Sequence, residues 1–117
     1  MNLTTGKLVR DDLPLKIAKD YAEVIVKKLS GWDAHQALVD KLAEEIDELA
    51  EAIEEQDYES IAEEIADCIA VLYGIASVHD VTRTEIKNKY DKKFESSGDF
   101  TEMYWVRAFG EKTTTNP

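Results

Sequence analysis

The sequence predicts an all-α fold, a bundle of about four helices with short extended segments near both termini. Two long stretches, 32–55 and 58–78, combine helix-forming residues with apolar residues at spacings of three and four, and neither contains proline. A third stretch, beginning at residue 82, opens with a helix-capping signature. Because short connections between long helices make antiparallel neighbours, these stretches are expected to pack together.

The composition limits the class of protein. A chain of 117 residues, 44% hydrophobic and 33% charged, is expected to form one globular domain over residues 1–117. It has neither an apolar run of about 18 residues that could span a membrane nor the apolar stretch of a signal peptide. Its single cysteine, Cys68, excludes an intramolecular disulfide. We therefore expect a cytoplasmic protein.

The net charge of −11 argues against nucleic acid as a partner, because phosphate backbones are bound by clustered Lys and Arg. The acidic residues are either a solvated face or ligands of metal ions that a polyphosphate then shares. The position of the acids in the sequence helps to decide between these alternatives.

Short elements are expected before the first long helix. Residues 7–13 are predicted to be an extended entry, in which Asp12 caps a short helix beginning near Pro14. The β-branched run 24–26 is either a short strand or the end of that helix, and we favour a strand. Ser30 and the acid three residues later resemble a capping box.

The two long helices each have one apolar stripe. In the first, over 32–55, the stripe consists of Leu38, Leu42, Ile46, Leu49 and Ile53. In the second, over 58–78, it consists of Ile61, Ile65, Cys68, Ile69, Leu72 and Ile75. A short break at 56–58 separates the helices, so they are predicted to form an antiparallel pair.

A third long helix and an aromatic tail are expected after the turn at 79–82. Thr82 and Glu85 form a capping-box signature, and the helix is predicted to continue to about Glu95, where Ser96-Ser97-Gly98 stops it. The tail, 100–109, is expected to be an extended segment packed on the bundle.

The two long helices share an acidic motif, apolar-Ala-Glu-Glu-Ile-x-acid-apolar, at 42–49 and again nineteen residues later at 61–68. At about 100° per residue, the acids at its fourth and seventh positions lie about 60° and 120° from the centre of the apolar stripe. If the stripes face each other, four carboxylates converge: Glu45, Glu48, Glu64 and Asp67. Such a cluster needs cations, and hard oxygen ligands suit Mg²⁺ or Mn²⁺.

The motif has two other interpretations. The acids can be ordinary surface faces balanced by bases such as Lys41, and this alternative stays open. A di-iron bundle requires Glu-x-x-His on two helices. Neither His35 nor His79 follows a glutamate by three residues, which disfavours a di-iron centre.

Glu44-Glu45-x-x-Glu48 followed by Glu64-x-x-Asp67 resembles the paired signature of the all-α NTP pyrophosphatase superfamily, which includes the MazG-like proteins. The start of the chain, Lys7 to Asp11 with Pro14, is similar to that of small phosphoribosyl-ATP pyrophosphohydrolase-like proteins. The resemblance implies a Mg²⁺-dependent enzyme, with Mn²⁺ as a possible substitute, that cuts a nucleoside triphosphate into monophosphate and pyrophosphate. It also implies a homodimer or homotetramer.

The resemblance further implies a role for each matched position. The metal ligands would be Glu45, Glu48, Glu64 and Asp67, and Glu44 would be an outer ligand or would orient the attacking water. Lys93, Lys89 and Arg10 are the candidates for phosphate contacts. Two alternatives remain: another substrate such as phosphoribosyl-ATP, or a non-catalytic helical module that binds a partner through its acidic face.

Four further residues are expected to have structural roles. Trp32 and Trp105 are expected to pack within the protein rather than to stack on a nucleotide base. His35 and His79 lie near predicted helix ends, where surface or capping positions are expected.

Overall fold

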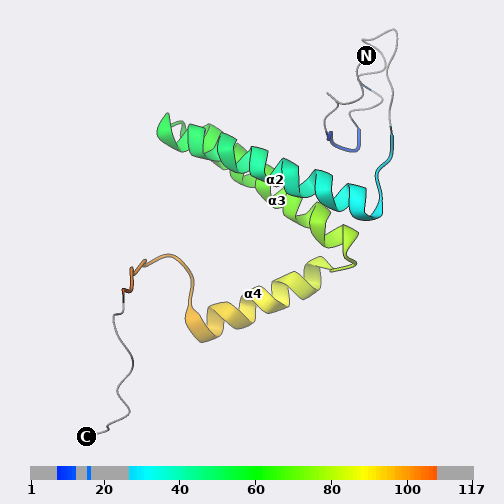
Figure 1. Cartoon of the computed structure of the whole chain (residues 1–117). Helices are drawn as coiled ribbons and strands as arrows, with labels where there is room; N and C mark the ends of the chain where they lie inside the picture. The colour runs from blue at the N-terminus through cyan, green and yellow to red at the C-terminus, as the bar shows by residue number, and fades with distance from the viewer. Residues whose placement is uncertain (1–7, 13–15, 17–26, 108–117) are drawn as a thin grey trace, which may run out of the picture.

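The computed structural model describes residues 8–12, 16 and 27–107. These residues contain three helices, α2 (Gly31–Glu54), α3 (Tyr58–Val78) and α4 (Arg83–Ser97), and no strand (Figure 1). The all-α class is confirmed, whereas about four helices were expected. Of the short helix predicted near Pro14, only Lys16 is among the described residues, and it is helical. The strand predicted at 24–26 falls outside the described residues.

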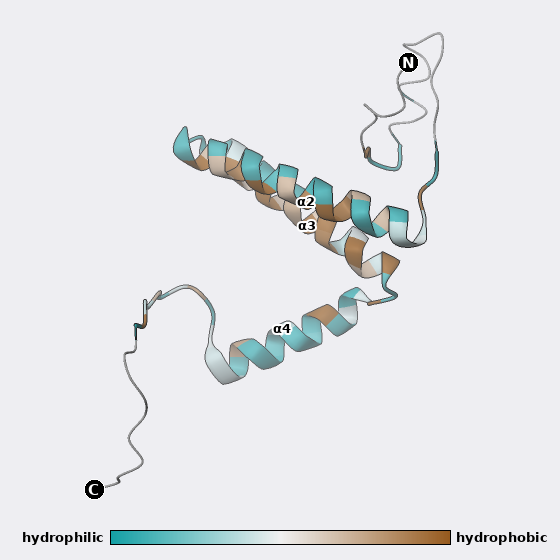
Figure 2. Ribbon diagram, in the orientation of Figure 1, coloured by the Kyte–Doolittle hydropathy of each residue, from teal (hydrophilic) through white to brown (hydrophobic). Residues whose placement is uncertain are grey.

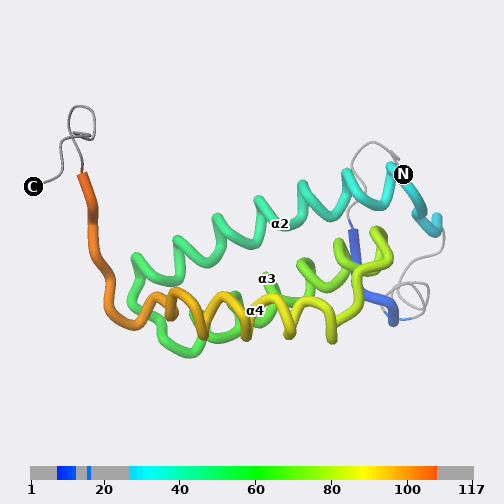
Figure 3. The backbone as a smooth tube through the Cα atoms, turned by 90° about the horizontal axis from the view of Figure 1, so that it is seen from below, coloured from blue at the N-terminus to red at the C-terminus, as the bar shows by residue number. Residues whose placement is uncertain are grey.

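α2 and α3 form an antiparallel hairpin, with their lengths packed side by side (Figures 1 and 3). The chain reverses at Gln56, whose backbone is left-handed with φ 57°. Asp57 then caps α3, because its carboxylate accepts hydrogen bonds from the Ser60 backbone N–H at 3.2 Å and the Ser60 hydroxyl at 2.8 Å. Near the other end of the hairpin, a Cβ on Gly74 would lie 2.9 Å from Leu38 Cδ2, so this glycine allows close packing.

The helix ends agree closely with the predicted boundaries. α3 begins and ends as predicted, α2 begins one residue earlier and ends one residue earlier, and α4 continues to Ser97. Thr82 and Glu85 form the predicted capping box, with both reciprocal hydrogen bonds present. Ser30 is the N-cap of α2, but its side chain makes no capping hydrogen bond, so the capping box expected there is wrong.

α4 leaves the hairpin instead of packing along it (Figure 1). Its apolar residues are confined to a narrow stripe at Ile86, Tyr90 and Phe94, and the rest of the helix is hydrophilic (Figure 2). Tyr90 and Phe94 are themselves 55% and 54% exposed. The prediction of a packed bundle within one chain is therefore wrong, because α4 has too little apolar surface to hold it against α2 and α3.

The aromatic tail also lies away from the hairpin as far as residue 107. Phe100 is 85% and Trp105 95% exposed, so the expected packing of the tail, and of this tryptophan, is wrong within one chain. Trp32 is also largely exposed and stacks on His35. His35 and His79 do lie near helix ends as expected: His79 is the C-cap of α3, and its Nε2 lies 2.9 Å from His35 Nδ1.

The core of the described part is small. Ala52, Val71 and Glu45 are the buried residues among those described. An uncovered surface, here called the apolar face, remains about half exposed on the hairpin; it consists of Val39, Ile46, Ile53, Ile65, Ile69 and Leu72. On each helix these residues recur at spacings of three, four or seven and form one stripe. Among the described helices, none is long and apolar enough to cross a membrane.

Candidate metal centre

Three carboxylates converge between α2 and α3. Glu45 and Glu48 from α2 and Glu64 from α3 each offer one oxygen atom, and these atoms all lie within 4.8 Å of one another. Glu45 and Glu48 are one helical turn apart on α2. Glu64 reaches them from α3 because it occupies the same position relative to the apolar stripe of its helix as Glu45 does on α2. We call these three residues the carboxylate triad.

Two oxygen atoms of the triad are buried without a hydrogen-bond partner. They are Oε2 of Glu45, a residue only 5% exposed, and Oε2 of Glu64. A buried carboxylate oxygen without a partner costs free energy, and a cation removes that cost. Mg²⁺ coordinates oxygens at about 2.1 Å, so ligands at opposite corners of its octahedron are about 4.2 Å apart. The triad therefore fits Mg²⁺ or Mn²⁺ after small side-chain rotations.

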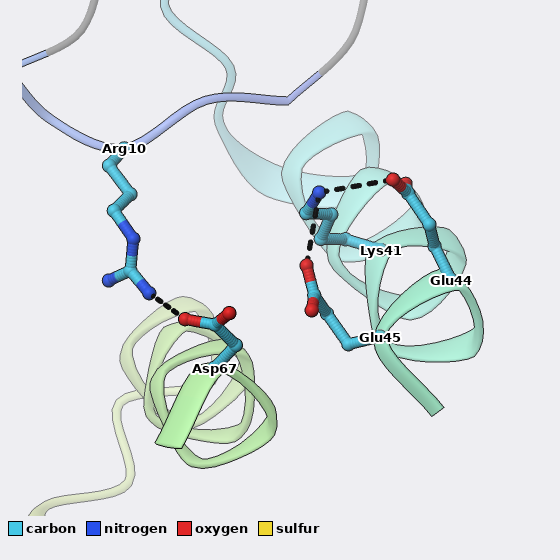
Figure 4. A network of polar contacts seen from close by, with 5 residues as sticks. All are labelled: Arg10, Lys41, Glu44, Glu45 and Asp67. Atoms are coloured by element: carbon cyan, nitrogen blue, oxygen red, sulfur yellow. Dashed lines mark hydrogen bonds and ion pairs between the residues drawn. The ribbon is translucent and has the colours of Figure 1, made fainter. Parts of the chain in front are cut away.

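Lys41 partly neutralises the triad. Its Nζ lies 3.2 Å from Glu45 Oε1 and 3.3 Å from Glu44 Oε1 (Figure 4). Partial burial acts to lower the pKa of Lys41, but the contacts with Glu45 and Glu44 outweigh it and raise that pKa. The sequence interpretation treated Lys41 only as a balancing base. Its position four residues before Glu45 was the signal that the two side chains would meet.

The remaining repulsion is relieved by a proton. The facing carboxylate of Glu45, the partial burial of Glu64 and the charge of Glu48 together raise the pKa of Glu64 to about 7. Burial and the charge of Glu45 raise the pKa of Glu48 as well. Burial acts to raise the pKa of Glu45, but its interactions with Glu64 and Lys41 lower that pKa overall. The metal-free triad thus holds a proton near neutrality, and a metal ion would displace it.

The raised pKa of Glu64 determines how the stability of the metal-free protein should depend on pH. Glu64 has an ordinary pKa of 4.5 when unfolded and about 7 when folded, so the folded state binds more protons between these values. Stability therefore falls as pH rises through this window. In EDTA, the melting temperature followed by circular dichroism should decrease from pH 5 to pH 8, and saturating Mg²⁺ at pH 8 should restore it.

The variant Glu64→Gln is the control for this pH dependence. It cannot take up the proton, so its melting temperature in EDTA should change much less between pH 5 and pH 8. A wild-type melting temperature that rises over the same interval would contradict the assignment of the proton to the triad.

The other candidate residues lie around the triad or away from it. Asp67 is one turn beyond Glu64 but does not belong to the group of converging oxygens; its carboxylate pairs with Arg10 (Figure 4). Glu44 is half exposed and contacts Lys41. The candidate phosphate ligands Lys89 and Lys93 are on α4, which is not packed on the hairpin, so one chain does not bring them to the triad.

An open groove of about 420 Å³ adjoins the triad. Its lining is mostly acidic and consists of Glu48, Glu51, Ala52, Glu55, Ser60 and Glu64. A polyphosphate could enter such a groove only with cations that neutralise the carboxylates.

Fold and site together define the class of protein: an all-α chain with a candidate site for a divalent cation between two helices. Residues 33–96, more than half of the chain, match the MazG nucleotide pyrophosphohydrolase domain, and the chain belongs to that family. The matched region contains both acidic motifs and extends through most of α4. No curated protein and no solved structure matches the chain.

Proposed function

We propose that the protein is a Mg²⁺-dependent hydrolase that converts nucleoside triphosphates into monophosphates and pyrophosphate, with Mn²⁺ able to replace Mg²⁺. The main support is the pair of buried, unpartnered oxygens on Glu45 and Glu64 within a converging triad. Membership of the MazG family supplies the reaction class. Clearance of unwanted nucleotides from the nucleotide pool is the role that we propose for this activity.

In this proposal the metal is held by Glu45, Glu48 and Glu64, with Asp67 as a further ligand. When bound, the metal would neutralise polyphosphate charge and make a bound water a better nucleophile towards the α-phosphorus. Lys41 helps to keep Glu45 ionised and thus ready to bind a cation.

Glu44, Arg10 and the lysines of α4 have supporting roles in the proposal. Glu44 lies next to the triad on α2 and contacts Lys41. Once this ion pair breaks, the Glu44 carboxylate would orient the attacking water. Arg10, Lys89 and Lys93 would contact the phosphates, and such positioning and charge stabilisation supply most of the catalysis of phosphoryl transfer.

We also propose that the chain acts as one domain, 1–117, in a homodimer or homotetramer. The half-exposed apolar face of the hairpin is the support, because apolar surface of this kind is typically covered in an assembly. A second copy could also supply the α4 lysines that one chain holds away from its own triad. The single cysteine, Cys68, is in keeping with a cytoplasmic location.

The activity is tested by measuring pyrophosphate release from ribo-, deoxy- and modified nucleoside triphosphates with Mg²⁺, with Mn²⁺ and with EDTA. We expect metal-dependent release of pyrophosphate together with a nucleoside monophosphate, and no release in EDTA. Release of inorganic phosphate instead would contradict the position of attack. No turnover on this panel, with turnover of phosphoribosyl-ATP, would replace the proposed substrate class.

A further inference from the structure

An ion pair joins the N-terminal segment to α3 beside the carboxylate triad. Nη2 of Arg10 lies 2.5 Å from Oδ1 of Asp67 (Figure 4), although the residues are 57 positions apart in the sequence. The side chain of Arg10 thus reaches α3 from the N-terminal segment (Figure 4). Asp67 follows Glu64 by three residues and therefore lies on the same side of this helix. The pair places a positive charge against a candidate metal ligand.

The ion pair engages the carboxylate that a metal ion at this position would need. Arginine stays protonated at all physiological pH values, so Arg10 does not release Asp67 by losing its charge. The side chains of Arg10 and Asp67 are 62% and 36% exposed, and ion pairs that are this accessible to water are weak. A divalent cation held by the neighbouring triad is therefore a strong competitor for Asp67.

We propose that Arg10 is a positioning residue that occupies Asp67 until a divalent cation takes its place. Metal binding at the triad recruits Asp67 and frees the guanidinium, whose planar, permanently charged group is suited to phosphate. Arg10 thus becomes available to a polyphosphate only after the metal has bound. This inference rests on the proposed function for its metal and its substrate class, and it adds competition between Arg10 and the metal.

The competition is tested on the full chain by titrating Mg²⁺ in a calorimeter, without nucleotide. Arg10→Gln should bind Mg²⁺ roughly two- to fivefold more tightly than the wild type, a factor typical of an exposed ion pair. In an Asp67→Asn background, Arg10→Gln should give no increase in Mg²⁺ affinity, because both substitutions remove the same Arg10–Asp67 ion pair. Lys87→Gln is the matched control: it removes the same charge from an exposed pair with Asp91 on α4 and should leave Mg²⁺ affinity unchanged.

A second measurement follows the guanidinium itself. The chain has three arginines, so the Nε–Hε NMR signal of Arg10 can be assigned by its loss in Arg10→Gln. Mg²⁺ should shift this signal in the wild type but not in Asp67→Asn.

An unchanged or weaker Mg²⁺ affinity in Arg10→Gln would overturn the inference. An equal increase in Mg²⁺ affinity in the Asp67→Asn background would also overturn it, because the increase would then come from the loss of a positive charge and not from the release of Asp67. Absence of Mg²⁺ binding in all variants would overturn both this inference and the proposed function. Mg²⁺ binding that depends on Arg10 as described, without any nucleotide hydrolysis, would support the inference and contradict only the proposed function.

Discussion

Replacing Glu64 by glutamine is expected to lower metal-dependent pyrophosphate release by more than about a hundredfold. The amide keeps the size of the side chain but removes the negative charge that α3 contributes to the triad. Glu45 and Glu48, both from α2, would then hold the metal from one side only. Calorimetry should show a matching loss of Mg²⁺ affinity, which separates lost metal binding from other causes of low activity.

Unfolding does not account for the expected loss. In the wild type above pH 7, Glu64 adds a third negative charge to the triad, so the glutamine variant should be the more stable protein in EDTA at pH 8. Activity and metal-free stability therefore change in opposite directions. Such opposition is typical of sites in which charges are held together for function at a cost in stability.

Glu63→Gln is the matched control for Glu64→Gln. Glu63 precedes Glu64 on α3, is exposed, and lies about 100° away around the helix. The same change of charge there should leave turnover within about twofold. Equal losses in the two variants, or full activity in Glu64→Gln, would contradict the role of the triad.

The local features of this site could be predicted from the sequence because they depend on helical periodicity. The stripe and acid positions in 42–49 and 61–68 predicted an antiparallel pair with converging acids, and the structure brings together Glu45, Glu48 and Glu64. Helical periodicity also explains the exposure of Glu44: it lies about 100° around α2 from Glu45 and therefore remains half exposed. The boundaries of α3 followed from its cap residues and from the breaks on either side.

Features that depend on distant contacts could not be predicted in this way. The partner of Asp67 is a residue 57 positions earlier, and no periodicity connects the two. The path of α4 depends on how much apolar surface it and the hairpin share, and a capping box determines only where the helix starts. The tail was expected to pack because it is aromatic, but aromatic composition does not identify the surface that covers it.

Ile69→Asp is expected to convert the protein into a monomer and to lower its melting temperature by about 10 °C or more. Ile69 is 46% exposed and lies within the apolar face, between Ile65 and Leu72 on α3. In the proposed assembly a second hairpin covers this face, so the new carboxylate would be buried without a partner. A loss of about 2 kcal/mol of stability corresponds to about 10 °C for a chain of this size.

The small core of the described chain makes this effect large. Ala52 and Val71 are its buried apolar residues, and the other apolar side chains of the hairpin are only partly removed from water, which limits their hydrophobic stabilisation. In the proposed assembly, further stabilisation comes from apolar surface that is buried on association, which would tie folding to assembly. Two copies joined through the apolar face would place four long helices together.

Size-exclusion chromatography with light scattering, together with thermal melts, tests this prediction. Asn88→Asp is the matched control, because it adds one negative charge at an exposed position of α4 outside the apolar face and should change neither mass nor melting temperature. A wild-type protein that is monomeric at micromolar concentration would contradict the proposed assembly. So would an Ile69→Asp variant with unchanged mass and stability. In that case the apolar face would not be an interface between copies, and the α4 lysines would have to reach the triad within one chain.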